Sequence, residues 1–146
     1  MKVRDIVAAI EAEVPLCWQE SYDNAGLAVG NPEAEVERLL VALDITRFVI
    51  EEAEQMGAQL IVAHHPVIFR PLKSVTDGDL AGGNVLLMAE KGIAAICAHT
   101  NLDAAQGGVN CALACKLELT EIGQLHPDGV DEQGREYGIG RVGMAH

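Results

Sequence analysis

The sequence predicts an α/β fold, in which a mixed or mostly parallel sheet is covered by helices and a metal site lies at the carboxyl ends of the strands. Three observations support this prediction. Short aliphatic runs alternate with amphipathic segments along the chain. Glycine or proline separates most of these segments. Polar side chains that can bind metals follow directly after the aliphatic runs, at the end of a sheet where such proteins bind ligands.

The N-terminal segment predicts a helix followed by irregular chain. Apolar residues recur at helical spacing between residues 3 and 14, and Pro15 ends the helix. Residues 16–32 are expected to be irregular, because Asp23-Asn24-Ala25-Gly26 is typical of a turn. The acid of this turn could approach a metal site, but an ordinary turn is the simpler interpretation.

The next segments alternate between strand and helix. A buried strand is predicted over residues 39–43, which ends at Asp44. A helix through residues 49–56 follows, with Thr46 as its cap and Gly57 behind it. A second strand covers residues 60–63 and ends at two adjacent histidines. This order is typical of strands joined by crossover helices, so the strands should be parallel.

The second half of the chain continues the alternation. A helix is predicted over residues 85–91 and a third strand over residues 93–98. Gly107-Gly108 begins a helix through residue 117, and residues 120–123 favour a further strand. Residues 126–146 contain five glycines, which indicates either a hairpin or the start of a further structural unit. With 146 residues, we expect one α/β domain over 1–146.

The composition excludes some classes of function. Twenty-two acidic residues against ten basic ones give a formal charge of −12, which repels nucleic acid and disfavours it as a partner. No apolar run approaches the roughly 18 residues that a bilayer-spanning helix needs, so we expect no membrane partner. The N-terminus shows no signal-peptide cleavage pattern. We therefore expect a cytoplasmic protein that acts on a small molecule.

Three of the five histidines stand at the ends of two predicted strands. His64 and His65 follow the second strand, and His99 follows the third, with Asp103 four residues further on. Because the carboxyl ends of parallel strands meet at one edge of a sheet, these side chains should converge. Imidazole with carboxylate suits zinc, iron, manganese or cobalt. The simpler alternative is a set of hydrogen-bonded histidines that only cap the strand ends.

Individual roles in this predicted site differ. We assign His64, His65 and Asp103 as metal ligands, and the adjacent imidazoles could each hold a different ion of a two-metal site. His99 is the candidate catalytic residue, because the reference pKa of imidazole lies near neutrality and suits proton transfer. It also competes with Asp103 as a ligand, or could orient a ligand or a water.

Several stretches resemble one known family, the NGG-one-interacting-factor-three-like proteins, often named GTP cyclohydrolase 1 type 2 homologs. They are YDNAGLAVG (22–30), ALD-x-T (42–46), IVAHHPVIF (61–69), AHTNLDAAQGGVN (98–110) and GIGRVG (138–143). The resemblance covers nearly the whole chain. It implies an α/β fold that holds two divalent metal ions in ring-like homohexamers, with His64, His65 and Asp103 as ligands.

The resemblance also implies a later His-x-x-x-Glu pair that completes the two-metal site, and this sequence contains no such pair. We therefore expect the chain to correspond to the N-terminal portion of the family. The resemblance implies a metal-dependent hydrolase of unknown substrate. The alternatives are a non-catalytic metal-binding or assembly module, and a GTP cyclohydrolase, although the sequence offers no P-loop and few aromatic residues to stack a purine.

Overall fold

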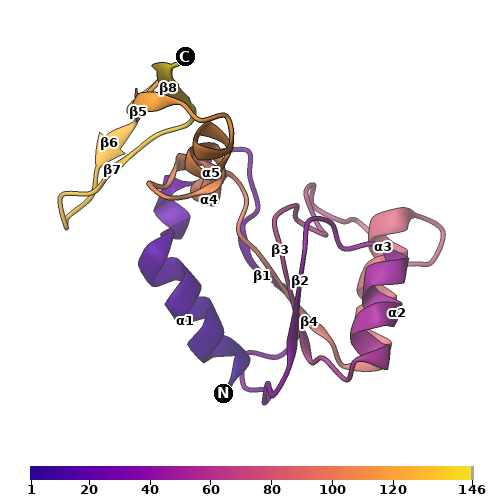
Figure 1. The fold of residues 1–146 in the computed structure, drawn as a ribbon. Coiled ribbons are helices and arrows are strands. Elements are labelled where there is room, and N and C mark those ends of the chain that lie inside the picture. Colours follow the sequence, from indigo (N-terminus) through magenta and orange to yellow (C-terminus); the bar gives the residue numbers. More distant parts are fainter. Residues whose placement is uncertain (146) are drawn as a thin grey trace.

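The computed structural model describes residues 1–145, and its centre is a four-stranded sheet (Figure 1). The strands are β1 (Gly26–Val29), β2 (Leu39–Ala42), β3 (Leu60–Ala63) and β4 (Ala94–Cys97), in the spatial order β1-β4-β3-β2. β2, β3 and β4 are parallel, and β1 runs antiparallel to β4. The predicted α/β fold with a mixed, mostly parallel sheet is confirmed.

The register brings the carboxyl ends of the three parallel strands to one level. Ala42 of β2 pairs with Ala63 of β3, which pairs with Cys97 of β4. The next residues on each strand therefore emerge side by side at one edge of the sheet. This edge is where the sequence predicts the metal site.

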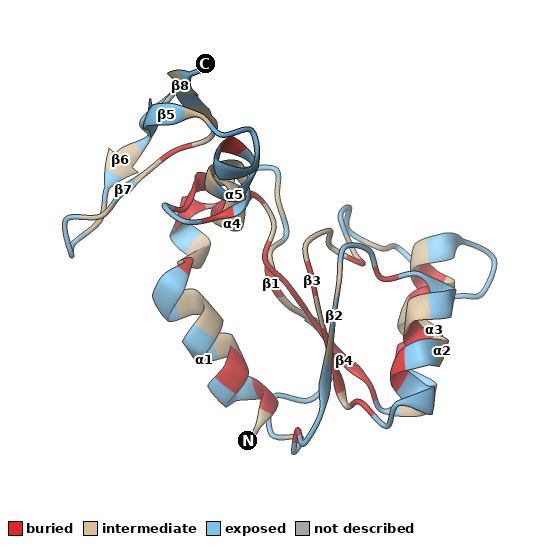
Figure 2. Cartoon of the chain, viewed as in Figure 1, coloured by how far each residue is buried: buried red, intermediate tan, exposed pale blue. Residues whose placement is uncertain are grey.

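Helices cover both faces of the sheet (Figure 1). α1 (Val3–Glu13) packs on one face, and α2 (Arg47–Gln55) and α3 (Leu80–Lys91) pack on the other. Alternate residues of β3 divide between the two cores, since Leu60 contributes to the α1 side and Ile61 to the α2–α3 side. Figure 2 shows this buried centre, with most exposed residues on the helix backs and loops.

Two predictions about element bounds are wrong. Residues 16–32 are not irregular throughout, because they contain a short 3-10 helix (Leu16–Trp18) and β1. β1 begins at a glycine with positive φ and contains only Leu27, Ala28 and Val29 after it, so the sequence shows no long aliphatic run there. α3 begins at Leu80 rather than residue 85, because the Asp79 side chain accepts a hydrogen bond from Gly82 N and caps the helix.

The chain after β4 forms a smaller layer beyond one end of α1 (Figure 1). It contains α4 (Thr100–Ala104), α5 (Val109–Lys116) and the strands β5 (Thr120–Gln124), β6 (Gly129–Val130), β7 (Glu136–Tyr137) and β8 (Arg141–Met144). β5 pairs with β8, and β6 pairs with β7 as a hairpin. The predicted strand and hairpin are confirmed, whereas the one-turn helix α4 is not foreseen by the sequence.

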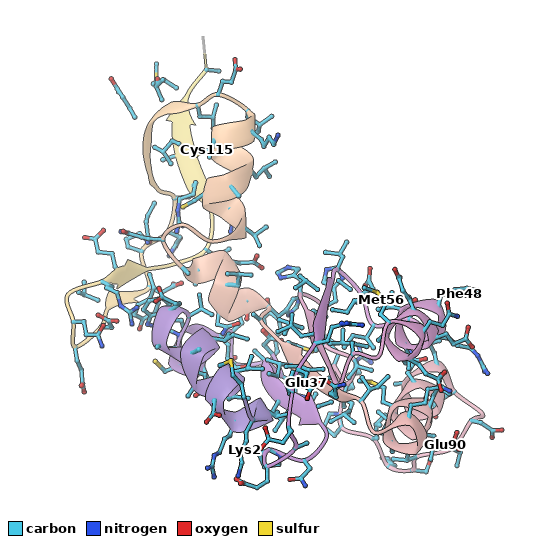
Figure 3. The ribbon with its side chains drawn as sticks, turned by 60° about the horizontal axis from the view of Figure 1, so that its bottom comes forward. Lys2, Glu37, Phe48, Met56, Glu90 and Cys115 are labelled. Carbon is cyan, nitrogen blue, oxygen red and sulfur yellow. The ribbon has the colours of Figure 1, made fainter. Side chains whose placement is uncertain are left out.

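Some features of the surface bear on function. Among residues 1–145, no helix is long and apolar enough to cross a membrane. Apolar side chains are exposed on the outer side of α2, where Phe48 projects away from the sheet (Figure 3). Isolated exposed residues of this kind are common in folded proteins and need no function.

Candidate metal centre

His64 and His65 emerge from the end of β3 while their backbone is still held by β2. His64 N donates to Ala42 O at 3.3 Å, and His65 N donates to Leu43 O at 2.9 Å. Neighbouring side chains on a regular strand point to opposite faces, but this strand has ended at Ala63. The two rings therefore lie together, with centroids 5.0 Å apart.

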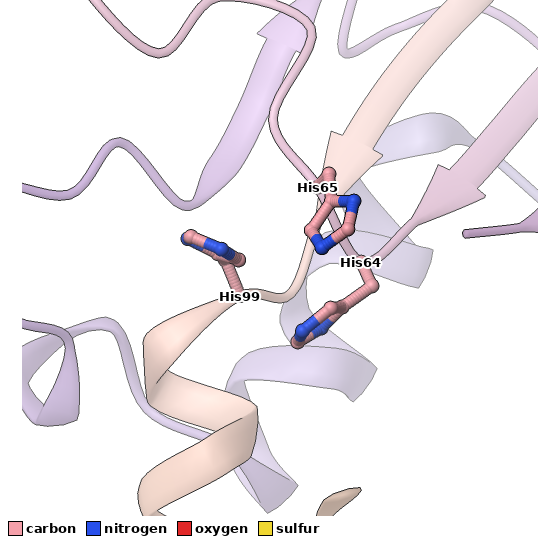
Figure 4. Close-up of side chains that lie close together, drawn as sticks. All are labelled: His64, His65 and His99. Carbon is pink, nitrogen blue, oxygen red and sulfur yellow. The ribbon is translucent and has the colours of Figure 1, made fainter. Parts of the chain in front are cut away.

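His99 reaches the same place from the end of β4. It is the residue before α4, and its φ and ψ of −111° and −111° turn the chain sharply out of the strand. The buried Asn101 side chain accepts a hydrogen bond from His99 N at 2.9 Å and holds this turn. The His99 ring centroid lies 5.1 Å from that of His64 and 5.7 Å from that of His65 (Figure 4).

Each of the three rings uses Nδ1 in a hydrogen bond to the protein. His64 Nδ1 lies 2.8 Å from Ala98 O. His65 Nδ1 lies 2.7 Å from Asp44 Oδ1, and His99 Nδ1 lies 2.9 Å from Asp23 Oδ1. A carbonyl or an ionised carboxylate can only accept, so Nδ1 carries the proton and each neutral ring keeps its lone pair on Nε2.

This arrangement is the one that metal-binding histidines usually have. A ligating imidazole typically donates its second N–H to a carbonyl or carboxylate, which fixes the ring and its tautomer. The three histidines each offer a ring nitrogen, and these nitrogens lie within 4.8 Å of one another. The group can therefore hold a metal ion.

Asp103 lies beside this group on α4. Its Oδ1 is 3.7 Å from His64 Nε2, which is too long for a hydrogen bond. Two atoms that each lie about 2.0–2.2 Å from one metal ion are at most roughly 4.4 Å apart. The separation of the carboxylate from the imidazole therefore suits two ligands of a common ion, and both side chains are only partly exposed.

The buried side chain of Asp23 holds the His99 ring through a hydrogen bond. Its carboxylate accepts from the His99 ring, from Thr100 N at 3.0 Å, from Asn24 N at 2.7 Å and from the Thr100 hydroxyl. Burial alone would raise the pKa of Asp23, but the hydrogen bonds from Thr100, His99 and Asn24 outweigh burial and lower that pKa below its ordinary value. Asp23 therefore presents a negative charge to the Nδ1 side of His99.

Aromatic side chains flank the open side of the centre. The Phe69 ring meets His99 edge-on, with centroids 6.1 Å apart, and Tyr22 meets Phe69 edge-on at 6.4 Å. Asn24 Nδ2 donates to Ile68 O at 2.7 Å and ties the two loops together. The chain segments after β3 and before β1 thus form one wall beside the histidines.

The structure brings every predicted site residue to one place. His64, His65, His99 and Asp103 all lie at the carboxyl edge of β3 and β4. Sequence reasoning missed the supporting roles of Asp23 and Asp44. Asp44 stands at a strand end, which was a usable signal, but Asp23 is in a turn 76 residues before its partner His99.

A mixed sheet with histidines and a carboxylate gathered at its carboxyl edge defines an α/β protein with a candidate metal centre. The family model described as Duf34/NIF3 (NGG1p interacting factor 3) matches residues 1–146. The chain belongs to this family, as the sequence resemblance predicted.

Relatives of known sequence carry a common name. A "GTP cyclohydrolase 1 type 2 homolog" of Clostridium perfringens is 39% identical over 142 residues, which cover 97% of this chain and 53% of that protein. One from Streptomyces coelicolor is 38% identical and covers 97% of this chain and 49% of that protein. The chain thus spans about half the length of these relatives.

Solved structures share the fold. A Bacillus cereus protein related to NIF3 superposes with a TM-score of 0.84 at 37% identity, covering 90% of this chain and 36% of that one. Reduced HcgD from Methanocaldococcus jannaschii superposes with a TM-score of 0.79 at 34% identity, covering 89% of this chain and 52% of that one.

Proposed function

We propose that the chain carries the metal-binding part of a metal-dependent hydrolase, with His64, His65 and Asp103 as ligands of a divalent transition metal. The observation that carries the proposal is the shared orientation of the histidines. The three rings offer nitrogens within 4.8 Å of one another, and each Nδ1 lies at hydrogen-bond distance from an acceptor, which leaves Nε2 to bind a metal. Imidazole and carboxylate donors suit zinc, iron, manganese or cobalt.

A divalent ion at such a site polarises a substrate and lowers the pKa of a water. Other residues of the chain orient the histidine rings and could transfer protons. The carboxylates of Asp44 and Asp23 fix the orientation and the tautomer of the His65 and His99 rings. His99 is the candidate for proton transfer at Nε2, because Asp23 holds its other nitrogen and fixes the ring in place. His99 as a third histidine ligand is the competing role.

Metal binding is tested first. We expect the purified chain to bind Zn²⁺, Mn²⁺ or Co²⁺ in titration calorimetry, and His64→Ala and Asp103→Ala to weaken binding by about 10-fold or more. His126→Ala is the matched control, since this histidine is exposed on the hairpin segment and lies outside the cluster. Equal affinity in all four proteins would exclude the assigned ligands.

The role of His99 is tested with the same titration. If His99 only moves protons, His99→Ala keeps most of the metal affinity and loses metal-dependent turnover. If His99 is a ligand, His99→Ala weakens binding as much as His64→Ala does. His99→Gln adds a comparison in which the side chain keeps hydrogen-bonding capacity but cannot act as a general base.

Hydrolase activity extends further beyond the described residues than metal binding does, because the relatives that carry the shared name are about twice as long as the chain. We infer a small-molecule substrate and a second metal ion, whose remaining ligands the resemblance assigns to a later segment. The ring-like homohexamer and the cytoplasmic location belong to the same proposal. Turnover of generic ester, phosphate or nucleotide substrates that requires added metal and disappears in His65→Ala would support it.

Two other functions compete. A non-catalytic metal-binding or assembly module would bind metal without turnover of any substrate. A GTP cyclohydrolase is favoured by the name of the relatives. It predicts metal-dependent loss of GTP with release of formate, which is measured directly by chromatography.

A further inference from the structure

A cavity lies beside the candidate metal centre, between the starts of α2 and α3. Its volume is about 300 Å³, which is at the lower end of the range for small-molecule sites. α2 follows β2 and α3 begins after the loop that follows β3, so both helices begin near the carboxyl edge of the sheet (Figure 1). His65 lines this cavity and also belongs to the histidine cluster. A molecule in the cavity would therefore adjoin an ion held at His65.

Most of the cavity wall is apolar, and one buried amide interrupts it. The apolar residues of the wall come from both helix starts and from the loop after β3, and they are Ile45, Pro66, Val67, Leu80 and Ala81. Asn84 also lines the cavity, although its exposed fraction is only 6%. Burial of a polar side chain is costly unless its hydrogen-bonding groups are used. The hydrogen bonds of Asn84 therefore decide what the cavity can bind.

Asn84 uses only part of its hydrogen-bonding capacity. Its Nδ2 donates to Ile45 O at 2.9 Å. A backbone carbonyl can only accept, so this contact fixes which end of the amide carries the nitrogen. Among the described residues, no group donates to Asn84 Oδ1, and only one N–H of Nδ2 has an acceptor. The Asn84 amide thus keeps one donor and one acceptor for a ligand.

This remaining pair of groups indicates a cyclic amide as the ligand. A donor and an acceptor on one amide are matched by a second amide that presents its N–H and its C=O on the same edge. Secondary amides of open chains are almost always trans, which places these two groups on opposite sides. The ring of a small lactam holds the amide cis and brings both groups to one edge. The apolar wall suits the rest of such a ring.

The charges around the cavity disfavour an anionic ligand. The starts of two helices carry partial positive charge, which by itself would attract an anion. Thr46 caps α2 and Asp79 caps α3, however, through hydrogen bonds from backbone N–H groups. The carboxylate of Asp79 lies at the start of α3, and Asp44 lines the cavity. Two full negative charges outweigh two partial positive ones, so a neutral ligand fits better.

We propose that this cavity, named the Asn84 pocket, binds a cyclic amide edge of the substrate. Asn84 Oδ1 accepts from the ring N–H, and Asn84 Nδ2 donates to the ring carbonyl. The ring then lies next to His65, against the loop after β3. The inference rests on the proposed hydrolase function, because it assigns the pocket to the substrate of the same metal centre. Occupation of the pocket itself requires no metal.

The first experiment titrates the metal-free chain of 146 residues, kept in EDTA, with δ-valerolactam and records amide proton–nitrogen correlation spectra. We expect a dissociation constant of roughly 1–10 mM, with the largest shifts at Thr46, Ala81 and Asn84. N-methyl-δ-valerolactam lacks the ring N–H and N-methylacetamide is trans, so each should bind at least about 10-fold more weakly. Inorganic phosphate, the anionic probe, should shift none of these residues.

Ala81→Leu tests the position of the ligand without altering the amide. Ala81 is half-buried and lines the pocket, so a leucine there fills space that the ring needs, and lactam affinity should fall at least about 5-fold. Ala112→Leu is the matched control, because it makes the same change at an exposed position of α5 and should leave the affinity unaltered.

Asn84→Leu removes the amide at similar volume and should abolish the preference for the lactam over its N-methyl form. Circular dichroism checks that this variant folds, since it also loses the hydrogen bond to Ile45 O. If it does not fold, Ala81→Leu and the N-methylated ligand still decide the question.

His64→Ala separates failure of this inference from failure of the proposed function. His64 is an assigned metal ligand and is not part of the pocket wall that the described residues form, so the variant should lose metal affinity and keep lactam affinity. The pocket is excluded if δ-valerolactam binds no more tightly than its N-methyl form, if Ala81→Leu binds it as the wild type does, or if phosphate binds more tightly. Each of these results leaves the metal titrations of the wild type unaffected.

Discussion

The edge that carries the histidines and the segment after α5 are stabilised in different ways. Around the histidines, β3 and β4 are buried on both faces, and residues such as Ile61, Ala95 and Ile96 are almost completely inaccessible. In the segment from residue 117 to residue 145, nearly all side chains are exposed or half-exposed, and the strands form two separate pairs. The first region therefore depends mainly on packing, whereas the second contributes only a few partly buried side chains such as Tyr137 and Ile139.

Hydrogen bonds from two arginines supplement the sparse packing of the C-terminal segment. Arg141 donates to the carbonyls of Gly138, Gly140, Ala104 and Ala105, which joins β8 to the end of α4. Arg135 donates to Asp131 and to Ala12 O, and its guanidinium lies 4.8 Å from the Trp18 ring centroid. These two side chains therefore help to connect the segment to the rest of the molecule, together with the stacking of Tyr137 on Trp18 at 5.2 Å.

The largest expected effect is the difference between the two regions in the free energy of unfolding lost when an isoleucine is truncated. Ile61→Ala removes a fully buried side chain from β3 and should lower the free energy of unfolding by about 2–5 kcal/mol. Ile122→Ala in β5 makes the same chemical change at a partly exposed position and should cost less than about 1 kcal/mol. Urea denaturation of both variants measures the difference. Similar losses would mean that the C-terminal segment has a core of its own.

Sequence reasoning succeeds where the physical cause is local. The aliphatic runs at residues 60–63 and 93–98 form strands in the buried middle of the sheet, as the sequence predicts. The run at residues 39–43 also forms a strand, but the prediction that it is buried is wrong, because β2 lies at the edge of the sheet and Leu39 and Val41 are exposed. The proximity of His64, His65 and His99 could then be predicted from the sequence, because parallel strands end at one edge of a sheet.

Sequence reasoning fails where the cause is a distant contact. β1 has no long aliphatic run, and its strand conformation depends on pairing with β4, about seventy residues later. The sequence predicts only a turn at Asp23, since no nearby residue indicates that its carboxylate accepts hydrogen bonds from His99 Nδ1 and the Thr100 hydroxyl. The start of α3 is misplaced because Gly82-Gly83 suggests a loop, whereas Asp79 caps a helix there.

The next effect concerns a carboxylate within the buried region. Asp23→Asn keeps the shape of the side chain but removes the charge that orients His99 and accepts from Thr100. If His99 takes part in binding the ion, metal affinity should fall by about 10- to 100-fold. Titration calorimetry measures it. Asp131→Asn is the control, because it makes the same change in the C-terminal segment and should leave metal affinity unaltered.

A smaller and more local effect is expected from Arg141→Lys. Lysine keeps the charge but cannot reproduce the planar fork of donors that reaches several carbonyls at once. Amide hydrogens of β5 and β8 should exchange faster, with a local opening free energy lower by about 1–3 kcal/mol, while those of β3 and β4 stay protected. Arg47→Lys, at an exposed pair with Glu51, is the matched control. Equal acceleration in β3 would show that the two regions unfold together.

The smallest effect is a dependence on pH confined to the β6–β7 hairpin. Asp131 accepts from Gln133 N at 2.9 Å, Arg135 N at 2.8 Å and Arg135 Nε at 2.7 Å. Desolvation alone would raise the pKa of Asp131, but these hydrogen bonds and the guanidinium charge of Arg135 lower it below its ordinary value. The folded hairpin therefore binds the proton more weakly than the unfolded chain does.

The sign of the pH effect follows from this difference. The contribution of Asp131 is present in full above the unfolded pKa of about 3.9, and it is lost as the pH falls through the lower folded pKa. Chemical shifts of Gly129 to Tyr137, followed from pH 5 downward, should show the hairpin loosening before β3 and β4 respond. Asp131→Asn should abolish this step. A step of the same size in the variant would assign the titration to another acid, because only Asp131 accepts both the backbone and the side chain of Arg135.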